Sequence, residues 1–182
     1  RMLADAWLLR FSAGYSRRAN SINPIYPGSL EPGQKITRCA QLYRSRRLPP
    51  VFKITPFVQP ANLDEILARA GYQQQAPTSV QWRHLANLPA PHVQTGQQWH
   101  SPATAWLAAY MRMNQVTAQQ AGSLEAILHH IAPPACYLSL IQQGETAACG
   151  LGVLEGELVG LFDLVTEPTL RRQGWGTNLI LN

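Results

Sequence analysis

Apolar residues in the second half of the chain gather in three runs that are joined by very short turns. The runs cover residues 136–142, 146–154 and 158–166, and the turn-forming residues Gln143-Gly144 and Gly156 separate them. Apolar and β-branched runs of this length between turn signals are typical of strands. The pattern therefore predicts three consecutive antiparallel strands joined by two hairpins.

Two helices are predicted ahead of these strands. The first starts at Ser101-Pro102, with proline at its first helical position, and its apolar face carries Trp106, Tyr110 and Met113. The second has Ser123 as its expected N-cap and ends before Pro133-Pro134. Its apolar residues follow the spacing of one helix face and are Leu124, Ile127, Leu128 and Ile131.

The first half of the chain predicts shorter elements. Residues 6–12 and 15–22 favour two strands that turn at Ala13-Gly14. Residues 32–47 favour a helix, and residues 51–55 favour a short strand.

A further helix is marked at both of its ends. Asn62 and Glu65 have the spacing of a capping box, and Gly71 is the residue expected just after the helix. A strand is predicted after it, over residues 75–84, through Val80 and Trp82.

These elements predict an α+β fold with two parts. A smaller α+β lobe covers residues 1–85, and residues 86–100, which are rich in proline, glutamine and glycine, form a linker. Residues 101–182 form the second unit. Its order of helix, helix, three strands, basic glycine loop and helix is the most informative part of the pattern.

Composition narrows the class of protein. Hydrophobic residues make up 46% of the chain and charged residues 14%, which excludes a disordered chain and a coiled coil. We find no signal peptide and no run of 18 apolar residues, so we expect a cytoplasmic protein without a membrane span. The cysteines Cys39, Cys136 and Cys149 fit neither a zinc pattern nor a disulfide framework, and no metal is expected.

The net charge of +5 is unevenly distributed along the chain. Residues 1–72 hold 11 of the 15 Lys and Arg residues but only 4 of the 10 Asp and Glu residues. No nucleic-acid-binding motif accompanies this charge, so we do not expect nucleic-acid binding. A cluster of polar residues is expected on a strand edge of the first lobe, and it consists of Arg17, Arg18, Asn20 and Ser21. It would bind an anionic or carboxylate-bearing ligand or, the interpretation we favour, serve the packing of the lobe onto the second unit.

A basic glycine-containing segment, Arg171-Arg172-Gln173-Gly174-Trp175-Gly176, lies between the last predicted strand and a helix that starts near Trp175. Glycines allow close backbone approach, the N–H groups at a helix start attract anions, and arginines bind phosphate oxygens. The segment therefore has the chemistry of a pyrophosphate site. It lacks the lysine of a Walker A loop, and it lacks the third glycine and the βαβ setting of a dinucleotide fingerprint.

The segment resembles the acyl-CoA-binding motif of the GCN5-related N-acetyltransferase (GNAT) family, in which Arg171, Gly174 and Gly176 occupy the defining positions. The preceding Pro168-Thr169-Leu170-Arg171 is similar to the family's approach to this loop. Segments of the first half, around residues 6–10, 14–21 and 49–54, resemble the degenerate N-terminal lobe of one GNAT subfamily. The resemblance implies a mixed or antiparallel GNAT-like sheet flanked by helices, after a smaller α+β lobe.

The resemblance also implies an activity, direct acetyl transfer from acetyl-CoA to a primary amine of a small molecule or peptide. Backbone groups of Leu164, Val165 and Thr166 would pair with the pantetheine arm. The pyrophosphate would be held by the loop residues Arg171, Arg172, Gln173, Gly174, Trp175, Gly176 and Thr177. Two roles are predicted for the Trp175 ring: it stacks on CoA, or it anchors the helix in the core.

A catalytic base is harder to assign. Asp163 lies on the strand that lines the amine site in the family, and we take it as the candidate catalytic residue, for amine binding or proton relay. Glu155 and Glu157, near the hairpin turn, are weaker candidates. We interpret Cys149 as a core thiol and His129-His130 as helix-terminal residues rather than metal ligands.

Two alternatives stay open. A non-catalytic acyl-CoA-binding protein or pseudoenzyme would share the cofactor loop, and a nucleic-acid-binding regulator would use the basic lobe. The resemblance further leads us to expect a truncated GNAT domain, because a helix, a strand, a helix and a hairpin follow the glycine loop in that fold. The missing part would include the tyrosine that protonates the thiolate, so activity of this chain alone stays open unless a partner or a swapped segment completes the sheet. A homodimer is one of the assemblies considered.

Overall fold

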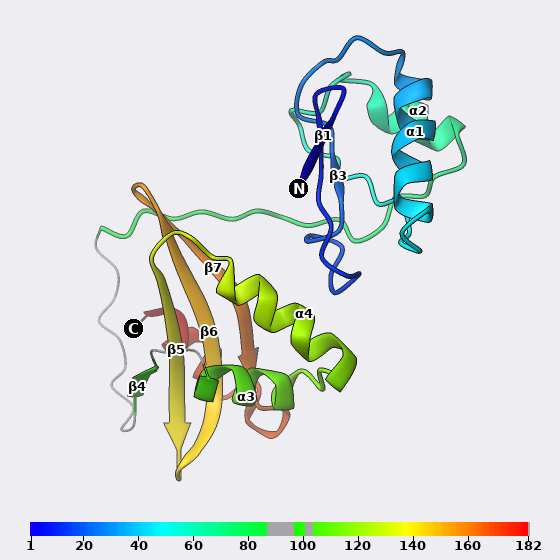
Figure 1. The fold of residues 1–182 in the computed structure, drawn as a ribbon. Helices are drawn as coiled ribbons and strands as arrows, with labels where there is room; N and C mark the ends of the chain where they lie inside the picture. Colours follow the sequence, from blue (N-terminus) through cyan, green and yellow to red (C-terminus); the bar gives the residue numbers. More distant parts are fainter. Residues whose placement is uncertain (87–96, 101–103, 182) are drawn as a thin grey trace. The chain divides into compact units, whose positions relative to one another are not determined.

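The computed structural model describes residues 1–86, 97–100 and 104–181. It divides into two compact units, Arg1–Trp82 and Arg83–Asn182, shown in Figure 1. Most of the predicted linker and the predicted helix start at Ser101-Pro102 lie outside the described residues. No helix within the described ranges has the length and apolar character that crossing a membrane requires.

The first unit contains a small antiparallel sheet in the order β1 (Met2–Ala4), β2 (Trp7–Leu9) and β3 (Ile22–Asn23). Asp5 and Ala6 both have positive φ angles, 43° and 68°, in the two-residue turn that joins β1 to β2. This geometry matches the twist of a tight hairpin. The strand predicted over residues 6–12 is therefore present but limited to Trp7–Leu9.

The strand predicted over residues 15–22 is wrong, apart from its last residue. Asn20 explains why, because its buried side chain replaces strand pairing as the organiser of this segment. Its Oδ1 accepts hydrogen bonds from the N–H groups of Ser12 (2.7 Å) and Gly14 (3.1 Å), and its amide donates to the carbonyls of Ser12 and Ser16. Arg17 and Arg18 therefore lie on a compact loop rather than on a strand edge.

Two helices complete the first unit, α1 (Pro32–Arg44) and α2 (Leu63–Arg69). The predicted capping box of α2 does not form, because the Asn62 side chain makes no capping hydrogen bond. The C-terminal prediction is confirmed: Gly71 has a φ of +84° and the Gly71 and Tyr72 N–H groups bond back to the carbonyls of Ala68 and Leu67. This pair of bonds is the Schellman arrangement.

Two further strand predictions fail, and for residues 75–84 the reason is exposure to solvent. Residues 51–55 contribute only an isolated bridge between Phe52 and Ile22, and residues 75–84 form no strand. Val80 and Trp82 are 89% and 81% exposed. Alternation of apolar and polar residues produces a strand only where a neighbouring strand and a core are available.

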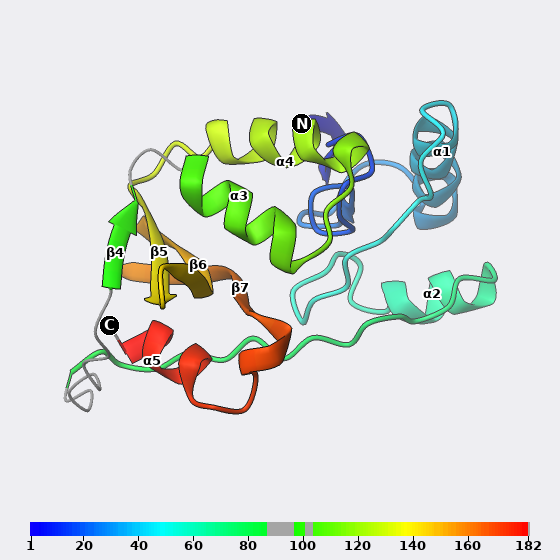
Figure 2. The same ribbon diagram turned by 90° about the horizontal axis from the view of Figure 1, so that it is seen from below.

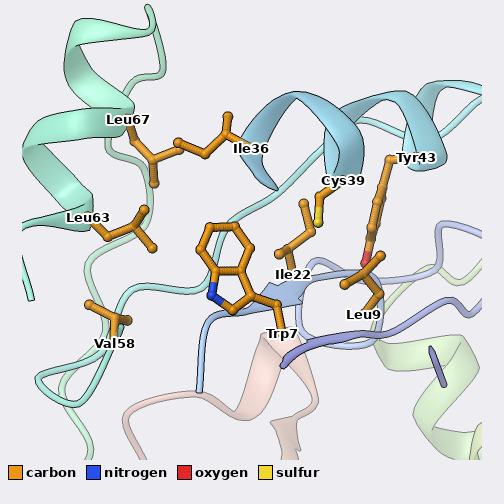
Figure 3. Packing of buried hydrophobic residues seen from close by; sticks show 9 residues of the cluster. All are labelled: Trp7, Leu9, Ile22, Ile36, Cys39, Tyr43, Val58, Leu63 and Leu67. Carbon is orange, nitrogen blue, oxygen red and sulfur yellow. The ribbon is translucent and has the colours of Figure 1, made fainter. Parts of the chain in front are cut away.

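The core of the first unit lies between the sheet and the two helices, as Figure 3 shows. Trp7 is fully buried at its centre, and its indole N–H donates to the carbonyl of Gln59 at 3.1 Å. The remaining buried members come from β2, β3, α1, α2 and the loop before α2, and they are Leu9, Ile22, Ile36, Cys39, Tyr43, Val58, Leu63 and Leu67.

A buried ion pair connects the β1–β2 turn to α1. Lys35 is 4% exposed, and its ammonium lies 3.2 Å from the Asp5 carboxylate and 4.4 Å from the centre of the Trp7 ring. The carboxylate also accepts hydrogen bonds from the N–H groups of Ser29 (2.8 Å) and Leu30 (3.0 Å) and from the Ser29 hydroxyl (2.8 Å). The two backbone bonds are the main reason that the pKa of Asp5 lies well below its ordinary value of 3.8.

The second unit is built on a four-stranded antiparallel sheet in the order β4 (Gln97–His100), β5 (Ala135–Gln142), β6 (Glu145–Glu155) and β7 (Leu158–Thr166). The prediction of three consecutive antiparallel strands is confirmed to within one residue at each end. The fold of the described residues is α+β, also as predicted.

Helices cover both faces of this sheet. Figure 2 shows α3 (Thr104–Met113) and α4 (Ala118–His129) on one face and α5 (Trp175–Leu181) on the other. Helix α4 starts earlier than predicted, because Thr117 and Gln120 form a reciprocal capping box, and Ser123 therefore lies inside the helix. On the opposite face, α5 packs through Trp175 and Leu179 against β5 and β6.

The Asp5 carboxylate yields a prediction about pH. Because its pKa is depressed in the folded chain, ionised Asp5 stabilises the fold above the pKa of the unfolded carboxyl, about 4, and this contribution disappears as the pH falls. We expect Asp5→Asn to lower the thermal unfolding midpoint at about pH 7 and to shrink the difference in midpoint between about pH 7 and about pH 3.

Asp64→Asn, at an exposed position of α2, is the matched control. Its midpoint is expected to follow that of the wild type within about 2 °C across this range. Wild-type pH dependence in Asp5→Asn would show that the Asp5 carboxylate does not contribute as described.

Candidate active site

The pairing of β6 with β7 changes register near the middle of the two strands. Cys149 pairs with Val165 and Leu151 pairs with Phe162, so Asp163 and Leu164 together face the single residue Gly150. This two-against-one arrangement is a β-bulge, which bends the strand and redirects its side chains. Asp163 has a φ of +51°, a left-handed conformation that aspartate tolerates better than most residues.

Gly150 is required by the bulge. A Cβ atom added at Gly150 would lie 2.5 Å from Cδ2 of Leu164 and 3.2 Å from Cδ2 of Leu179. The absence of a side chain therefore lets Leu164 and α5 pack directly onto β6. The bulge, Gly150 and α5 form one packing unit.

The glycine loop links the end of β7 to α5. A 3₁₀ turn (Pro168–Leu170) leads into Arg172 and Gly174, which have φ angles of +61° and +87°. The first helical hydrogen bond runs from the Asn178 N–H to the Gly174 carbonyl at 2.9 Å. The N–H groups of the residues before Asn178 therefore have no acceptor within α5.

Side chains of the loop fold back onto the chain before it. The Arg171 Nε lies 3.4 Å from the carbonyl of Thr166, and the Gln173 amide donates to the carbonyl of Thr169 at 3.2 Å. The Trp175 side chain is buried among Leu140, Ala148 and Leu179. Of the two readings of Trp175, the structure favours the helix anchor.

A hollow of about 380 Å³ lies between the end of β7 and the start of α5. Its lining residues are Leu164, Val165, Thr166, Gly176, Thr177, Leu179 and Ile180. The structure therefore brings the predicted strand residues together with Gly176 and Thr177. Arg171, Arg172 and Gln173 are exposed on the loop and do not line the hollow.

Helix α3 contacts the bulge from the other face of the sheet. The indole N–H of fully buried Trp106 donates to the carbonyl of Gly150 at 2.9 Å. Tyr110, one turn later, stacks on Trp106 with 5.0 Å between ring centres and 9° between planes. Its hydroxyl donates to Oδ1 of Asp163 at 3.4 Å.

Sequence reasoning placed Trp106 and Tyr110 on one apolar helix face but did not assign them a role at the site. Their four-residue spacing is the available signal, because residues i and i+4 are neighbours on a helix. The spacing does not reveal which strand the helix covers. Gly150 was likewise missed, since an isolated glycine in a strand signals a bulge or a close approach without showing which.

The remaining candidate residues, Glu155, Glu157 and Cys149, either lie away from the bulge or have an unreactive side chain. Glu155 and Glu157 are exposed at the hairpin that joins β6 to β7. Cys149 is fully buried, and burial, with a smaller effect from the neighbouring Asp163 carboxylate, raises its pKa to about 12. A thiol with this pKa stays protonated at neutral pH and is a poor nucleophile.

The structure offers no candidate metal centre in the ranges that it describes. No three His, Cys, Asp or Glu side chains there are grouped so that they could hold an ion. His129 and His130 lie at the end of α4, where Nδ1 of His130 is 2.6 Å from the carbonyl of Ala126.

Comparison with known proteins adds evidence that is independent of this geometry. Residues 1–180 match the family described as "Probable histone acetyltransferase Rv0428c C-terminal". The chain is also 22% identical over 179 residues to the "Uncharacterized N-acetyltransferase YobR" of Bacillus subtilis, a match that covers 96% of this chain and 71% of that protein. No solved structure matches.

Both likenesses agree with the resemblance on which the glycine loop was interpreted. The family match extends over both units, from the first residue to within two residues of the last. The predicted relationship to GNAT-type acetyltransferases is confirmed, and the chain belongs to the family of probable histone acetyltransferase Rv0428c C-terminal domains.

Proposed function

We propose that this acetyltransferase uses acetyl-CoA and transfers the acetyl group directly from the thioester to a primary amine. The observation that carries the proposal is the hollow in which the end of β7 faces Gly176 and Thr177 of α5. A strand end and a helix start on two sides of one hollow provide the two kinds of backbone group that a long, partly anionic thioester needs.

The strand side suits an amide-containing chain. In the sheet formed by the described residues, β7 is an edge strand, and Leu164, Val165 and Thr166 lie at its end beside the hollow. The backbone N–H and C=O groups of an edge strand can pair with another extended chain. We assign these groups to the amides of the pantetheine arm.

The helix side suits a pyrophosphate. N–H groups at the start of a helix carry partial positive charge and bind anions. Gly174, in its left-handed conformation, allows the loop to turn into α5, and a Cβ placed there would have no atom within 4 Å. Its position is therefore open toward a ligand. The exposed guanidinium groups of Arg171 and Arg172 add charge-assisted contacts to phosphate oxygens.

The bulge supplies the groups that we assign to the acetyl-transfer reaction, a carboxylate and a backbone N–H. An amine attacks the thioester only when it is neutral, so a base must accept its proton. Asp163 is partly buried at the bulge and hydrogen-bonded to Tyr110, and we assign amine binding and proton relay to its carboxylate. The bulge also takes backbone out of the regular ladder, and we assign a backbone N–H group there to polarise the thioester carbonyl.

The loop assignment is tested by acetyl-CoA titration calorimetry on Gly174→Glu. The new side chain brings negative charge and conformational strain to the proposed pyrophosphate site, so the dissociation constant is expected to rise at least about tenfold. Gly144→Glu is the matched control, because Gly144 lies in the β5–β6 turn with a φ of +85° and equally open surroundings. Equal weakening in both variants would remove the loop assignment.

The base assignment is tested by Asp163→Asn, which keeps the shape of the side chain and removes its charge. CoA release from acetyl-CoA is measured with an alkylamine, an amino acid and a lysine-rich histone-tail peptide, the last because of the family's description. We expect kcat/KM for an accepted amine to fall about 100-fold. Glu157→Gln, at the exposed hairpin, is the control, and full turnover in Asp163→Asn would contradict the role.

Direct transfer is tested by Cys149→Ala. Because the buried thiol stays protonated, its loss is expected to change turnover by no more than about threefold and to leave the protein's intact mass without an acetyl adduct during the reaction. A covalent adduct in the wild type that the variant lacks would indicate a two-step mechanism through the thiol.

A further inference from the structure

Helix α3 holds the strand that carries the candidate base at two points. At the bulge, Tyr110 donates to Asp163. Beyond the end of β7, Arg112 forms an ion pair with Glu167 at 2.6 Å and also donates to the carbonyl of Thr146 on β6 at 3.3 Å. The three residues between these points, Leu164, Val165 and Thr166, are the strand residues that line the hollow.

The same helix fixes the strand opposite the bulge. Trp106 donates to the Gly150 carbonyl at 2.9 Å, and Gly150 is the residue that the two bulge residues face. Trp106 cannot move without breaking this buried hydrogen bond and leaving the indole N–H and the Gly150 carbonyl unpaired. The indole is therefore a fixed surface in the core.

Tyr110 takes its position from that surface. Its ring lies parallel to the Trp106 ring, which in turn meets the edge of Tyr137 at 5.3 Å between ring centres. Aromatic pairs in such arrangements restrict each other's orientation. The stack therefore determines where the Tyr110 hydroxyl lies, and that hydroxyl contacts the Asp163 carboxylate.

The Asp163 carboxylate also lies near enough to β6 to act on the buried Cys149 thiol. Cys149 lies next to Gly150 on β6, and the Asp163 charge contributes to the rise in the pKa of its thiol, while Arg112 acts in the opposite direction. The field of the carboxylate thus reaches the buried part of β6.

We infer that Tyr110 is a positioning residue of the acetyltransferase: it orients the Asp163 carboxylate at the bulge, and α3 holds the hollow's strand segment between Tyr110 and Arg112. The catalytic effect of this positioning rests on the proposed function, acetyl transfer from acetyl-CoA. Loss of the Tyr110 hydroxyl keeps the Asp163 carboxylate but removes one of the contacts that orient it. Orientation of a base matters in the transition state. The neighbouring backbone groups assigned to the pantetheine arm remain held at the end of β7 by the Arg112–Glu167 ion pair, so KM for acetyl-CoA is expected to change little.

The experiment compares Tyr110→Phe with Tyr137→Phe. Both variants remove one hydroxyl from the same aromatic cluster around Trp106, and both keep the rings. In Tyr110→Phe we expect kcat to fall about fivefold or more while KM for acetyl-CoA changes less than about twofold. Tyr137→Phe is expected to keep both constants within about twofold. Equal effects in the two variants, or a change in KM alone, would overturn the inference.

A double-mutant cycle tests the pair directly. If Tyr110 acts through Asp163, then Tyr110→Phe in the background of Asp163→Asn changes kcat far less than it does in the wild type. Independent, multiplicative effects of the two substitutions would contradict the inference.

Hydrogen–deuterium exchange separates failure of this inference from failure of the proposed function, since it needs no turnover. We expect the amides of Asp163 and Leu164 to exchange at least about threefold faster in Tyr110→Phe than in the wild type or in Tyr137→Phe, while those of Val165 and Thr166, next to the retained Arg112–Glu167 ion pair, stay unchanged. Faster exchange in a chain that releases no CoA would retain the positioning role and refute the acetyl transfer. Unchanged exchange in a chain that does release CoA would refute the positioning role alone.

Discussion

The strand residues that line the hollow between β7 and α5 follow directly on a register shift between β6 and β7. One extra residue in β7 places Asp163 and Leu164 opposite Gly150. A bulge of this kind survives only where the surrounding packing compensates for the lost ladder bonds. Here Gly150 leaves space for Leu164 and Leu179 on one face, and Trp106 holds the Gly150 carbonyl on the other. The bulge is thus fixed from both sides of the sheet.

The first unit is stabilised differently, because polar side chains provide the connections that its very short strands do not. Its strands are two or three residues long, too short to define a lobe by ladder bonds alone. Asn20 closes the loop after β2, and Asp5 with buried Lys35 joins the hairpin turn to α1. The Asn20 and Asp5 side chains each make several hydrogen bonds, which is the condition under which polar groups inside a fold stabilise it.

Because of this difference, the secondary structure of the second unit could be predicted from the sequence better than that of the first. The strands of the second unit could be located because long apolar runs and two-residue turns are local signals. The start of α4 was missed because Thr117 and Ser123 are both good caps, and only the reciprocal bond to Gln120 selects Thr117. Strands were predicted over residues 15–22 and 75–84 because alternation does not show whether a partner strand exists.

The site was predictable to a similar, partial extent. The glycine loop is a contiguous motif, so its residues and its place before a helix could be read directly. The contacts of Asp163 could not be predicted from the sequence, because its partner Tyr110 lies 53 residues away on another element. The positive φ of Asp163 was equally hidden, since it results from the register of two strands and not from the local sequence.

The burial of Trp175 has a consequence for how the loop meets an anion. The indole fixes the first residue of α5 in the core while the loop residues before it, Arg171 to Gln173, stay exposed. One end of the loop is thereby ordered when the chain folds, not when a ligand arrives. That end of the loop has therefore already lost its conformational entropy in the folded protein, so an anion bound as proposed would leave less of it to be lost on binding.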